Sequence, residues 1–516
     1  MSHRIFRLFL SLIILVGLAA MQAPPVVRAA GPWYVATTGN DGNDCLSPGT
    51  ACGTINGAIG KASAGEIVKV MVGTYTDIGA EVVFIIQDIT LSGGWDATFT
   101  NQNGMSAIDG QGSRRGITLN NIGPVVIENF VIQNGFSGIG GGGGIFNNGG
   151  TITINNTVIK GNSAGDPCCT GGSGGGGIAN GGTVFLNNST VSGNTILGGF
   201  YGSGILNYGT ITINNSSVSG NTAGDGIYNG ALQTMILNNS TVSGNPSGGV
   251  FNNVGTLTFQ NSTISDNAFG IYNNGGTVTI QNSILAGNMS AGIPNDCIFT
   301  LESAGYNLIG NTSGCSFTPV TGDLTNIEPK LGPLVEPAGL PGYHSLLPGS
   351  PAIDAGNPAG CTDQNGNLLT TDQRGVARPQ GLRCDIGAFE LEAENPVIEV
   401  PIDIIPGSTT NIINLRSAGT VPVAILSTAT FNAPALVNKS SLTFGKTGNE
   451  ASLSHCLTKQ LPDVNGDGRP DLLCYFRIGL TGLAPGNPQA ILRGLTMSGT
   501  AFEGVDLVKV SGSKNP

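Results

Sequence analysis

The sequence predicts an all-β protein, in which a parallel β-helix solenoid is followed by a C-terminal β-sandwich-like module. Three observations lead to this fold class. A twelve-residue phrase recurs between Pro124 and Asn288, and apolar residues alternate inside each copy, as they do along a β-strand. Beyond residue 397 the phrase is gone, and short apolar runs alternate with turn residues, which is typical of antiparallel sandwiches.

The spacing of the phrase indicates a solenoid. Its copies start 27, 32, 27, 24, 22 and 21 residues apart. A period in this range is typical of folds in which each unit buries its apolar face only by stacking on its neighbours. The copies begin at Pro124, Thr151, Thr183, Thr210, Thr234, Thr256 and Thr277.

The apolar residues predict three short strands in each coil. Repeat positions two and four are apolar, and a third apolar residue follows at position nine after a turn, as in Ile152, Ile154 and Ile159. A further short run, such as residues 144–147, precedes each phrase. We therefore expect residues 124–296 to form regular triangular coils. Stacked about 4.8 Å apart, the readable coils would make a rod on the order of 35 Å long.

Asparagine occupies repeat position six in every copy. This residue type tolerates the left-handed backbone that a tight turn needs, and stacked carboxamides can hydrogen-bond along the rod. We expect an amide ladder at this position, although the N-x-Ser/Thr sequons there would also permit glycosylation. The residues are Asn129, Asn156, Asn188, Asn215, Asn239, Asn261 and Asn282.

Residues 1–29 have the features of a secretory signal peptide. Arg4 and Arg7 precede an apolar run from Leu8 to Ala20, and small residues follow where a signal peptidase cleaves. No later run is long and apolar enough to span a membrane. The chain has 83 Gly, 10% charged residues and a net charge of −11, which argues against nucleic acid as a partner. We expect a secreted, extracellular protein without a transmembrane segment.

The ten cysteines lie in sequence-local pairs. An even number in a secreted chain favours disulfides. The alternative, a metal site, is poorly supported by three histidines and the lack of CxxC spacing. The connectivity of the adjacent Cys168 and Cys169 stays open. The other expected pairs are Cys45–Cys52, Cys297–Cys315, Cys361–Cys384 and Cys456–Cys474.

Residues 30–123 are expected to form an N-terminal cap, with a helix over residues 54–62, and the first coils, because a solenoid must cover its terminal apolar face. The stretch contains Y-V-A-T-T-G-N-D-G-N-D-C from Tyr34, L-S-G-G-W-D from Leu91 and I-D-G-Q-G from Ile108. These motifs resemble the opening of secreted bacterial β-helix proteins of the pectin-lyase-like superfamily. The resemblance implies a right-handed parallel β-helix.

Residues 297–391 continue the resemblance. The motifs Y-N-L-I-G at Tyr306, H-S-L-L-P-G-S-P-A-I-D-A-G at His344, D-Q-R-G-V-A-R-P at Asp372 and C-D-I-G-A-F-E at Cys384 are similar to the choice-of-anchor Q region of bacterial surface proteins. Residues 336–343 depart from that pattern, because they lack its Asn-Gly-Gly-Pro-Thr. The resemblance implies irregular terminal coils, an exit cap and association with a cell surface.

A linker at residues 392–397 precedes the sandwich-like module of residues 398–516. The module carries D-V-N-G-D-G-R-P-D, in which oxygen-bearing side chains alternate around a glycine turn, as calcium loops require. We expect a structural calcium ion, with an ordinary Asx-rich turn as the alternative. The expected ligands are Asp463, Asn465, Asp467, the Arg469 carbonyl and Asp471.

The regular coils carry few groups that could catalyse a reaction. The superfamily includes pectate lyases and polygalacturonases, which need clustered carboxylates or a basic residue. No arginine occurs between Gly116 and Gln373. The carboxylates of the coils occupy different repeat positions; they are Glu128, Asp166, Asp225 and Asp266. We therefore predict no catalytic residue.

The long loops before the Gly-Ile runs are the expected binding surface, because binding sites favour loops on rigid scaffolds. The candidate ligand-binding residues are Asp166, Phe200, Tyr201 and Asp225. The predicted function is a non-enzymatic binding or structural role, adhesion-like, towards an extracellular polysaccharide or another cell-envelope component. The alternative is a carbohydrate-active enzyme, a polysaccharide lyase or glycoside hydrolase.

Overall fold

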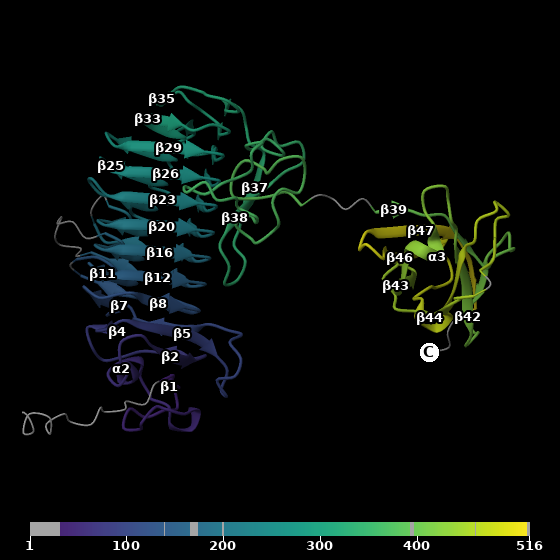
Figure 1. Ribbon diagram of the computed structural model, residues 1–516, viewed down its shortest axis with the longest axis horizontal. Helices are drawn as coiled ribbons and strands as arrows, with labels where there is room; N and C mark the ends of the chain where they lie inside the picture. The colour runs from purple at the N-terminus through teal and green to yellow at the C-terminus, as the bar shows by residue number, and fades with distance from the viewer. Residues whose placement is uncertain are drawn as a thin grey trace, which may run out of the picture. The chain divides into compact units, whose positions relative to one another are not determined.

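The computed structural model describes residues 31–138, 140–165, 174–198, 201–392, 397–459 and 461–512. The chain divides into two compact units, Met1–Glu392 and Ala393–Pro516, and the first is a stack of coils (Figure 1). The predicted signal peptide and most of the predicted linker lie outside the described residues. Among the described helices, none is long and apolar enough to cross a membrane.

Each regular coil contributes one strand to each of three parallel sheets. Sheet A holds repeat positions one to five, sheet B holds positions eight to ten, and sheet C holds the Gly-Ile run. A residue pairs with the same repeat position of the next coil, as Thr151 does with Thr183 and Ile159 with Val191. The parallel β-helix and its triangular coil are confirmed.

The strands of the coils have the following bounds. Sheet A contains β1 (Trp33–Val35), β2 (Glu66–Met71), β5 (Ile89–Trp95), β8 (Val125–Glu128), β12 (Thr151–Asn155), β16 (Thr183–Asn187), β20 (Thr210–Asn214), β23 (Thr234–Asn238), β26 (Thr256–Gln260) and β29 (Thr277–Gln281). Sheet B contains β3 (Thr74–Tyr75), β6 (Ser106–Asp109), β9 (Phe130–Gln133), β13 (Val158–Lys160), β17 (Thr190–Ser192), β21 (Ser217–Ser219), β24 (Thr241–Ser243), β27 (Thr263–Ser265), β30 (Ile284–Leu285), β34 (Leu308–Ile309) and β36 (Leu324–Thr325). Sheet C contains β4 (Glu81–Ile85), β7 (Arg115–Asn120), β11 (Ile145–Asn148), β15 (Ile178–Asn180), β19 (Ile205–Asn207), β22 (Ile227–Asn229), β25 (Val250–Asn253), β28 (Ile271–Asn274) and β33 (Cys297–Ser303), and β33 also pairs with β29 of sheet A.

Inward-facing aliphatic side chains fill the coil interior. Repeat positions two, four and nine are fully buried, for example Ile211, Ile213 and Val218. Together with the isoleucines of sheet C they form one hydrophobic cluster that runs from Trp33 to Ile309. Each coil alone would expose these side chains, so the coils are stable only as a stack.

All seven asparagines at repeat position six adopt left-handed backbone, with φ between 46° and 59°, as the sequence predicts. The expected amide ladder at this position is present only in pairs: Asn239 donates to Asn215, and Asn282 donates to Asn261. Asn156 and Asn188 point outward and are exposed. A left-handed residue on a convex turn directs its side chain to the outside, so this position carries a surface row and not a continuous buried ladder.

Continuous ladders lie at three positions that the sequence reasoning missed. One is a partly buried row at repeat position five, formed by Asn155, Asn187, Asn214 and Asn238. At repeat position twelve, each buried carboxamide donates to the next one along the rod, through Asn162, Asn194, Asn221, Asn245, Asn267 and Asn288. In sheet C, a second buried ladder runs through Asn147, Asn180, Asn207, Asn229, Asn252 and Asn273. These ladders satisfy the polar groups of the inner corners.

A short helix covers the N-terminal end of the stack. Helix α2 (Ile55–Ile59) begins after Thr54, whose hydroxyl accepts the N–H of Gly57 as an N-cap. The helix is shorter than predicted and buries Ile55 and Ile59 against the first coil. The 3-10 turn η1 (Pro48–Thr50) and the Cys45–Cys52 disulfide complete the cap.

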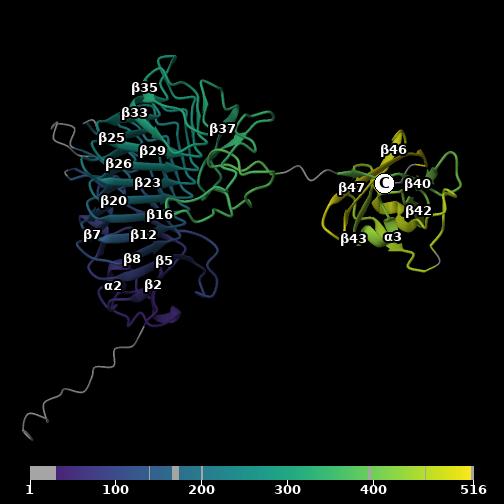
Figure 2. The same cartoon turned by 45° about the horizontal axis from the view of Figure 1, so that its top comes forward.

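Residues 331–392 do not form the predicted exit cap. The coils end at β36, with β35 (Cys315–Phe317) beside β33. The chain then turns back and lies along sheet B as a side segment, defined as residues 331–392 (Figures 1 and 2). Its hairpin of β37 (Leu331–Val335) and β38 (Tyr343–Leu346) lies beside the middle coils. Hydroxyl groups on the outer face of sheet B bind the segment: Ser219 donates to Glu336 at 2.7 Å, and Thr241 donates to Gln373 at 2.6 Å.

The remaining strands of the first unit are short. The strands β10 (Phe136–Ser137), β14 (Ser163–Ala164) and β18 (Thr195–Ile196) form a small parallel ribbon, and β31 (Met289–Ser290) pairs with β32 (Ile293–Pro294). Both structures lie in the loops between sheets B and C, which the sequence reasoning described only as irregular.

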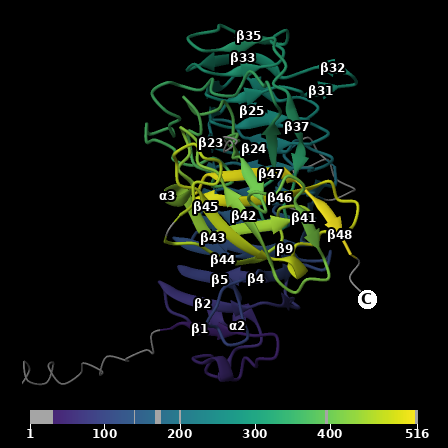
Figure 3. The ribbon, with the colours of Figure 1, turned by 90° about the vertical axis from the view of Figure 1, so that its right-hand side faces the viewer.

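The second unit is the predicted sandwich-like module (Figure 3). One four-stranded sheet contains β39 (Ile398–Glu399), β47 (Ala501–Leu507), β46 (Gln489–Thr496) and β43 (Val437–Gly445), and the other contains β40 (Ile402–Ile404), β42 (Thr420–Ile425), β45 (Leu472–Arg477) and β44 (Leu453–Cys456). The strands β41 (Ile412–Asn414) and β48 (Lys509–Ser511), α3 (Ala433–Leu436) and the 3-10 turn η2 (Ile478–Leu480) complete it. Phe444, Phe476 and Phe502 lie in its single core.

Candidate functional site

A groove of about 430 Å³ lies between the asparagine row of the early coils and the side segment. Its floor is the carboxamides of Asn156, Asn188 and Asn215. Its walls come from two stretches of the side segment, residues 337–343 and 371–375. The groove therefore exists only because the side segment turns back along the coils.

The floor of the groove presents hydrogen-bonding groups that the protein itself does not use. Among the described residues, the side-chain amides of Asn156 and Asn188 have no hydrogen-bond partner, and Asn215 uses only its oxygen, which accepts from Asn239. Each carboxamide offers two N–H donors and one acceptor. Because the three side chains occupy one repeat position, they recur at the coil spacing of about 4.8 Å.

The walls of the groove contain apolar and aromatic side chains and one guanidinium group that is stacked on aromatic rings. Pro337, Leu340 and Tyr343 supply the apolar side, and Leu340 is 61% exposed. Arg374 stacks on Tyr343 and Phe389, with its guanidinium carbon 5.2 and 3.7 Å from the ring centroids. Such stacking and the planar guanidinium hold the wall rigid.

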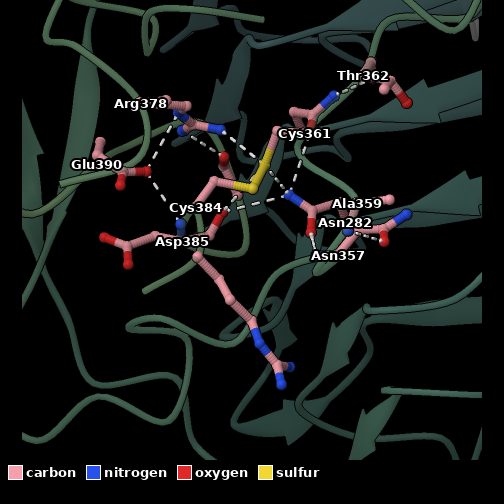
Figure 4. The surroundings of a disulfide bond; sticks show 12 residues. Asn282, Asn357, Ala359, Cys361, Thr362, Arg378, Cys384, Asp385 and Glu390 are labelled. Carbon is pink, nitrogen blue, oxygen red and sulfur yellow. Dashed lines mark hydrogen bonds and ion pairs between the residues drawn. A yellow bond between two sulfur atoms is a disulfide. The ribbon is translucent and has the colours of Figure 1, made fainter. Parts of the chain in front are cut away.

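The side segment is fixed by a buried cluster around the Cys361–Cys384 disulfide (Figure 4). Arg378 is almost fully buried and pairs with Glu390 at 3.4 Å. Burial is the largest influence on both groups and disfavours their charged forms, lowering the pKa of Arg378 and raising that of Glu390. Asn282 of the asparagine row donates to the Cys361 sulfur, so the cluster joins the segment to the coils.

The acidic and basic groups beside the groove are already bound within the protein. Asp372 is 1% exposed, and its two oxygens accept four hydrogen bonds, from three backbone N–H groups and Nε of Arg374. His344 is buried between the hydroxyl of Ser243 and a backbone carbonyl. Asp266 lies 3.9 Å from the same Nε2 atom that meets Ser243, so these three residues do not have the arrangement of a catalytic triad.

Two of the four residues predicted to bind a ligand fall within the described structure. Asp166 and Phe200 lie outside the described residues, as do Cys168 and Cys169. Tyr201 packs edge-on against Tyr228, with 5.1 Å between the ring centroids. Asp225 is 7% exposed, and burial raises the pKa of its carboxyl to about 7. Binding of a ligand by these residues stays a prediction.

An aromatic row on the outside of sheet C escaped the sequence reasoning. Tyr228, Phe251 and Tyr272 follow the buried isoleucine or valine of successive coils, and their rings stack at 5.2 and 4.8 Å with nearly parallel planes. The aromatic residue after each Gly-Ile or Gly-Val pair was the available signal. Stacked rings cover one another's faces and present their edges to solvent. The row therefore stabilises the packing of the coils, and its ring faces are not available to pack against a sugar.

The side chains that were predicted to bind calcium are hydrogen-bonded within their own loop. Asp463, Asp467 and Asp471 each accept backbone N–H groups, Asn465 does the same, and Arg469 pairs with Asp467 at 3.0 Å. Asp471 is fully buried. Within the described ranges, no group of three or more His, Cys, Asp or Glu side chains is arranged to hold a metal. The loop in this conformation has the hydrogen bonds of an Asx-rich turn, and calcium stays a prediction.

The four disulfides that were predicted from near pairs are confirmed. They are Cys45–Cys52, Cys297–Cys315, Cys361–Cys384 and Cys456–Cys474. Each closes a short loop within one part of the fold, as expected in a solenoid whose coils contact only their neighbours.

Comparisons with known proteins agree with the coil architecture. A family model described as a right handed beta helix region matches residues 177–317. The first unit is therefore a right-handed parallel β-helix. No curated protein shows a significant match to the sequence.

Two solved structures align with much of the chain at low identity. The crystal structure of pectate lyase Pel9A is 17% identical, with a TM-score of 0.40, and the alignment covers 69% of this chain and 96% of that one. The structure of XylC with xylose is 11% identical, with a TM-score of 0.37, and the alignment covers 70% of this chain and 98% of that one.

Proposed function

We propose that the protein is a secreted or cell-surface-associated β-helix protein that binds polysaccharide without cleaving it. The groove carries the proposal. Its uncommitted carboxamides can hydrogen-bond sugar hydroxyls, while Leu340 and Tyr343 can pack against the apolar faces of sugar rings. Groups that recur along the rod suit a polymer better than a single sugar. The signal-like N-terminus and the four disulfides support an extracellular location.

The chemistry of the groove favours binding over cleavage. A lyase needs a base that can take a proton, and a hydrolase needs carboxylates that can give or accept one. Asp372, the only carboxylate among the residues that line the groove, has its oxygens occupied by four donors. A carbohydrate-active enzyme remains the alternative function, and it makes a different prediction in the same assay.

Sedimentation with insoluble polysaccharides tests the proposal. The mature protein would be mixed with pectin, cellulose and chitin particles, and the fraction that sediments would be measured. The supernatants would be assayed for unsaturated products and reducing ends. We expect saturable retention on at least one polymer without product. Steady release of ends would establish the enzyme, and no retention on any polymer would refute the binding role.

A further inference from the structure

The side segment covers the later part of the asparagine row and shows which chemical group the row binds. Asn239, Asn261 and Asn282 each donate a side-chain N–H to a backbone carbonyl of the segment. The acceptors are the carbonyl oxygens of Thr371, Thr362 and Asp385, at 3.2, 2.7 and 3.2 Å respectively. At three successive coils, repeat position six therefore recognises an amide carbonyl.

Asn282 makes both contacts that an amide group permits (Figure 4). Its Nδ2 donates to the Asp385 carbonyl at 3.2 Å, and its Oδ1 accepts the backbone N–H of Asn357 at 3.1 Å. A carboxamide thus pairs with one carbonyl and one N–H at the same time. The carbonyl and the N–H belong to two different peptide units of the segment, Asp385 and Asn357.

The asparagines that the side segment leaves uncovered have the same backbone conformation as the covered ones. The backbone φ of Asn156, Asn188 and Asn215 is 47°, 49° and 48°, and that of Asn282 is 48°. The first three carboxamides face the groove and not the side segment. The same side chain in the same conformation should recognise the same chemical group when a ligand supplies it.

We infer that the groove binds a glycan whose sugars carry acetamido groups. This inference rests on the proposed function and specifies its ligand. The carbonyl of an acetamido group can accept an N–H from an asparagine, as the carbonyls of the side segment do, and its methyl group can pack on Leu340 and Pro341, which line the same groove. Among the described residues, Tyr343 has no hydrogen bond from its hydroxyl, so this group is free to meet a sugar hydroxyl.

The spacing of the row favours a glycan over a polypeptide. An extended peptide presents carbonyls to one side about every 6.6 Å, whereas the asparagines recur at about 4.8 Å. A β-1,4-linked chain of hexopyranose rings advances by roughly one coil per sugar, and neighbouring rings face opposite sides, so successive asparagines would meet an acetamido group and a hydroxymethyl group in turn. A peptide would lose this register after the first contact.

Calorimetric titration of the full chain tests the inference with matched oligomers. The probes are the β-1,4-linked hexamers of N-acetylglucosamine and of glucose, which differ in the acetamido group, and a neutral Gly-Ser hexapeptide with blocked ends. We expect the acetylated hexamer to bind at least tenfold more tightly than the glucose hexamer, since two extra hydrogen bonds give about this ratio.

A matched pair of variants locates the site. Asn188→Gly removes one carboxamide and keeps a residue that tolerates positive φ, so it should weaken binding of the acetylated hexamer by about tenfold. Asn121→Gly is the control, because Asn121 is also exposed at a φ of 53° but lies at another corner of the coil. Its binding should match that of the unmodified protein.

Three results would overturn the inference, and they differ in what they imply for the function. Equal affinity for the two hexamers would reject the acetamido specificity and leave polysaccharide binding intact. Tighter binding of the peptide, lost in Asn188→Gly, would make a polypeptide the occupant. Binding that is equal in Asn188→Gly and the unmodified protein would place the ligand outside the groove.

Discussion

At the scale of single residues, the repeat position of an asparagine decides what it does. At position twelve the side chain points into the coil and is fully buried, as for Asn194. At position six the left-handed turn points it outward, as for Asn188. The same residue type therefore stabilises the rod at one corner and forms a row of outward-pointing carboxamides at another.

The first prediction ranks three asparagine substitutions by their buried hydrogen bonds. Asn194 makes four side-chain hydrogen bonds, Asn215 makes one and Asn188 makes none among the described residues. Asn194→Ala should lower the free energy of unfolding by about 3 kcal/mol or more, because it leaves buried hydrogen-bonding groups without partners. Asn215→Gly should cost about 1 kcal/mol, and Asn188→Gly less. Guanidinium titrations measure the order, and an equal cost at all three sites would contradict it.

The second prediction concerns the buried carboxyl of Asp225. Burial raises its pKa from the ordinary 3.8 to about 7, so the folded state holds the proton more tightly than the unfolded chain. The free energy of unfolding should therefore fall as the pH rises from about 4 to about 7, by at most about 4 kcal/mol. Asp225→Asn should abolish this fall and raise the melting temperature at pH 8.

An exposed carboxylate is the control for Asp225. Glu302 is exposed on β33, so Glu302→Gln should leave the pH dependence of the melting temperature unchanged. The interpretation of Asp225 would be wrong if its Asn variant melted like the unmodified protein at pH 8 and kept the same fall between pH 4 and pH 7.

At the scale of elements, the coils follow from a repeat of apolar positions in the sequence. The position of the side segment instead depends on contacts with coil residues that are distant in the sequence. The strands β12 to β29 were predictable because their apolar positions repeat and each coil meets only its neighbours. The side segment has no repeat, and its hydrogen bonds to the coils join residues 75 to 150 positions apart, as between Asn282 and Asn357 or Thr190 and Leu340. No local pattern encodes such a partner, so the groove could not be predicted even though its floor asparagines were.

The third prediction is that the Cys361–Cys384 disulfide holds the groove wall in place. The double variant Cys361→Ser, Cys384→Ser removes a crosslink over 23 residues, which typically costs about 2 to 4 kcal/mol. The coils have a separate core, so the loss should appear as faster hydrogen exchange in residues 331–392 and weaker glycan binding, with the β-sheet signal in circular dichroism preserved.

The second unit supplies the control for this substitution. Cys456 and Cys474 form a disulfide between β44 and β45. Replacing both by serine should not change glycan binding or exchange in residues 331–392. If both pairs of substitutions had the same effect on binding, the side segment would not owe its position to the local crosslink.

At the scale of the whole molecule, the largest hydrophobic core of each unit shares no residue with that of the other. The coil core is a long row of mainly aliphatic side chains, whereas the second unit packs aromatic rings together with aliphatic side chains between two mainly antiparallel sheets. Because stability in each unit comes from its own core, a ligand that binds one unit should shift the unfolding of that unit alone. This independence makes the calcium hypothesis testable in the full chain.

The last prediction is that calcium raises the stability of the second unit and not of the coils. Calcium binding requires the pair between Asp467 and Arg469 to open, because that pair now occupies one of the expected ligands. At a free concentration one hundred times the dissociation constant, binding would add about 2.7 kcal/mol. Calorimetry of the full chain with calcium and with chelator should then show one transition that shifts and one that does not, and Asp467→Ala should remove the shift. If both transitions stay fixed after complete removal of calcium, the loop from Asp463 to Asp471 is only the Asx-rich turn that its hydrogen bonds describe.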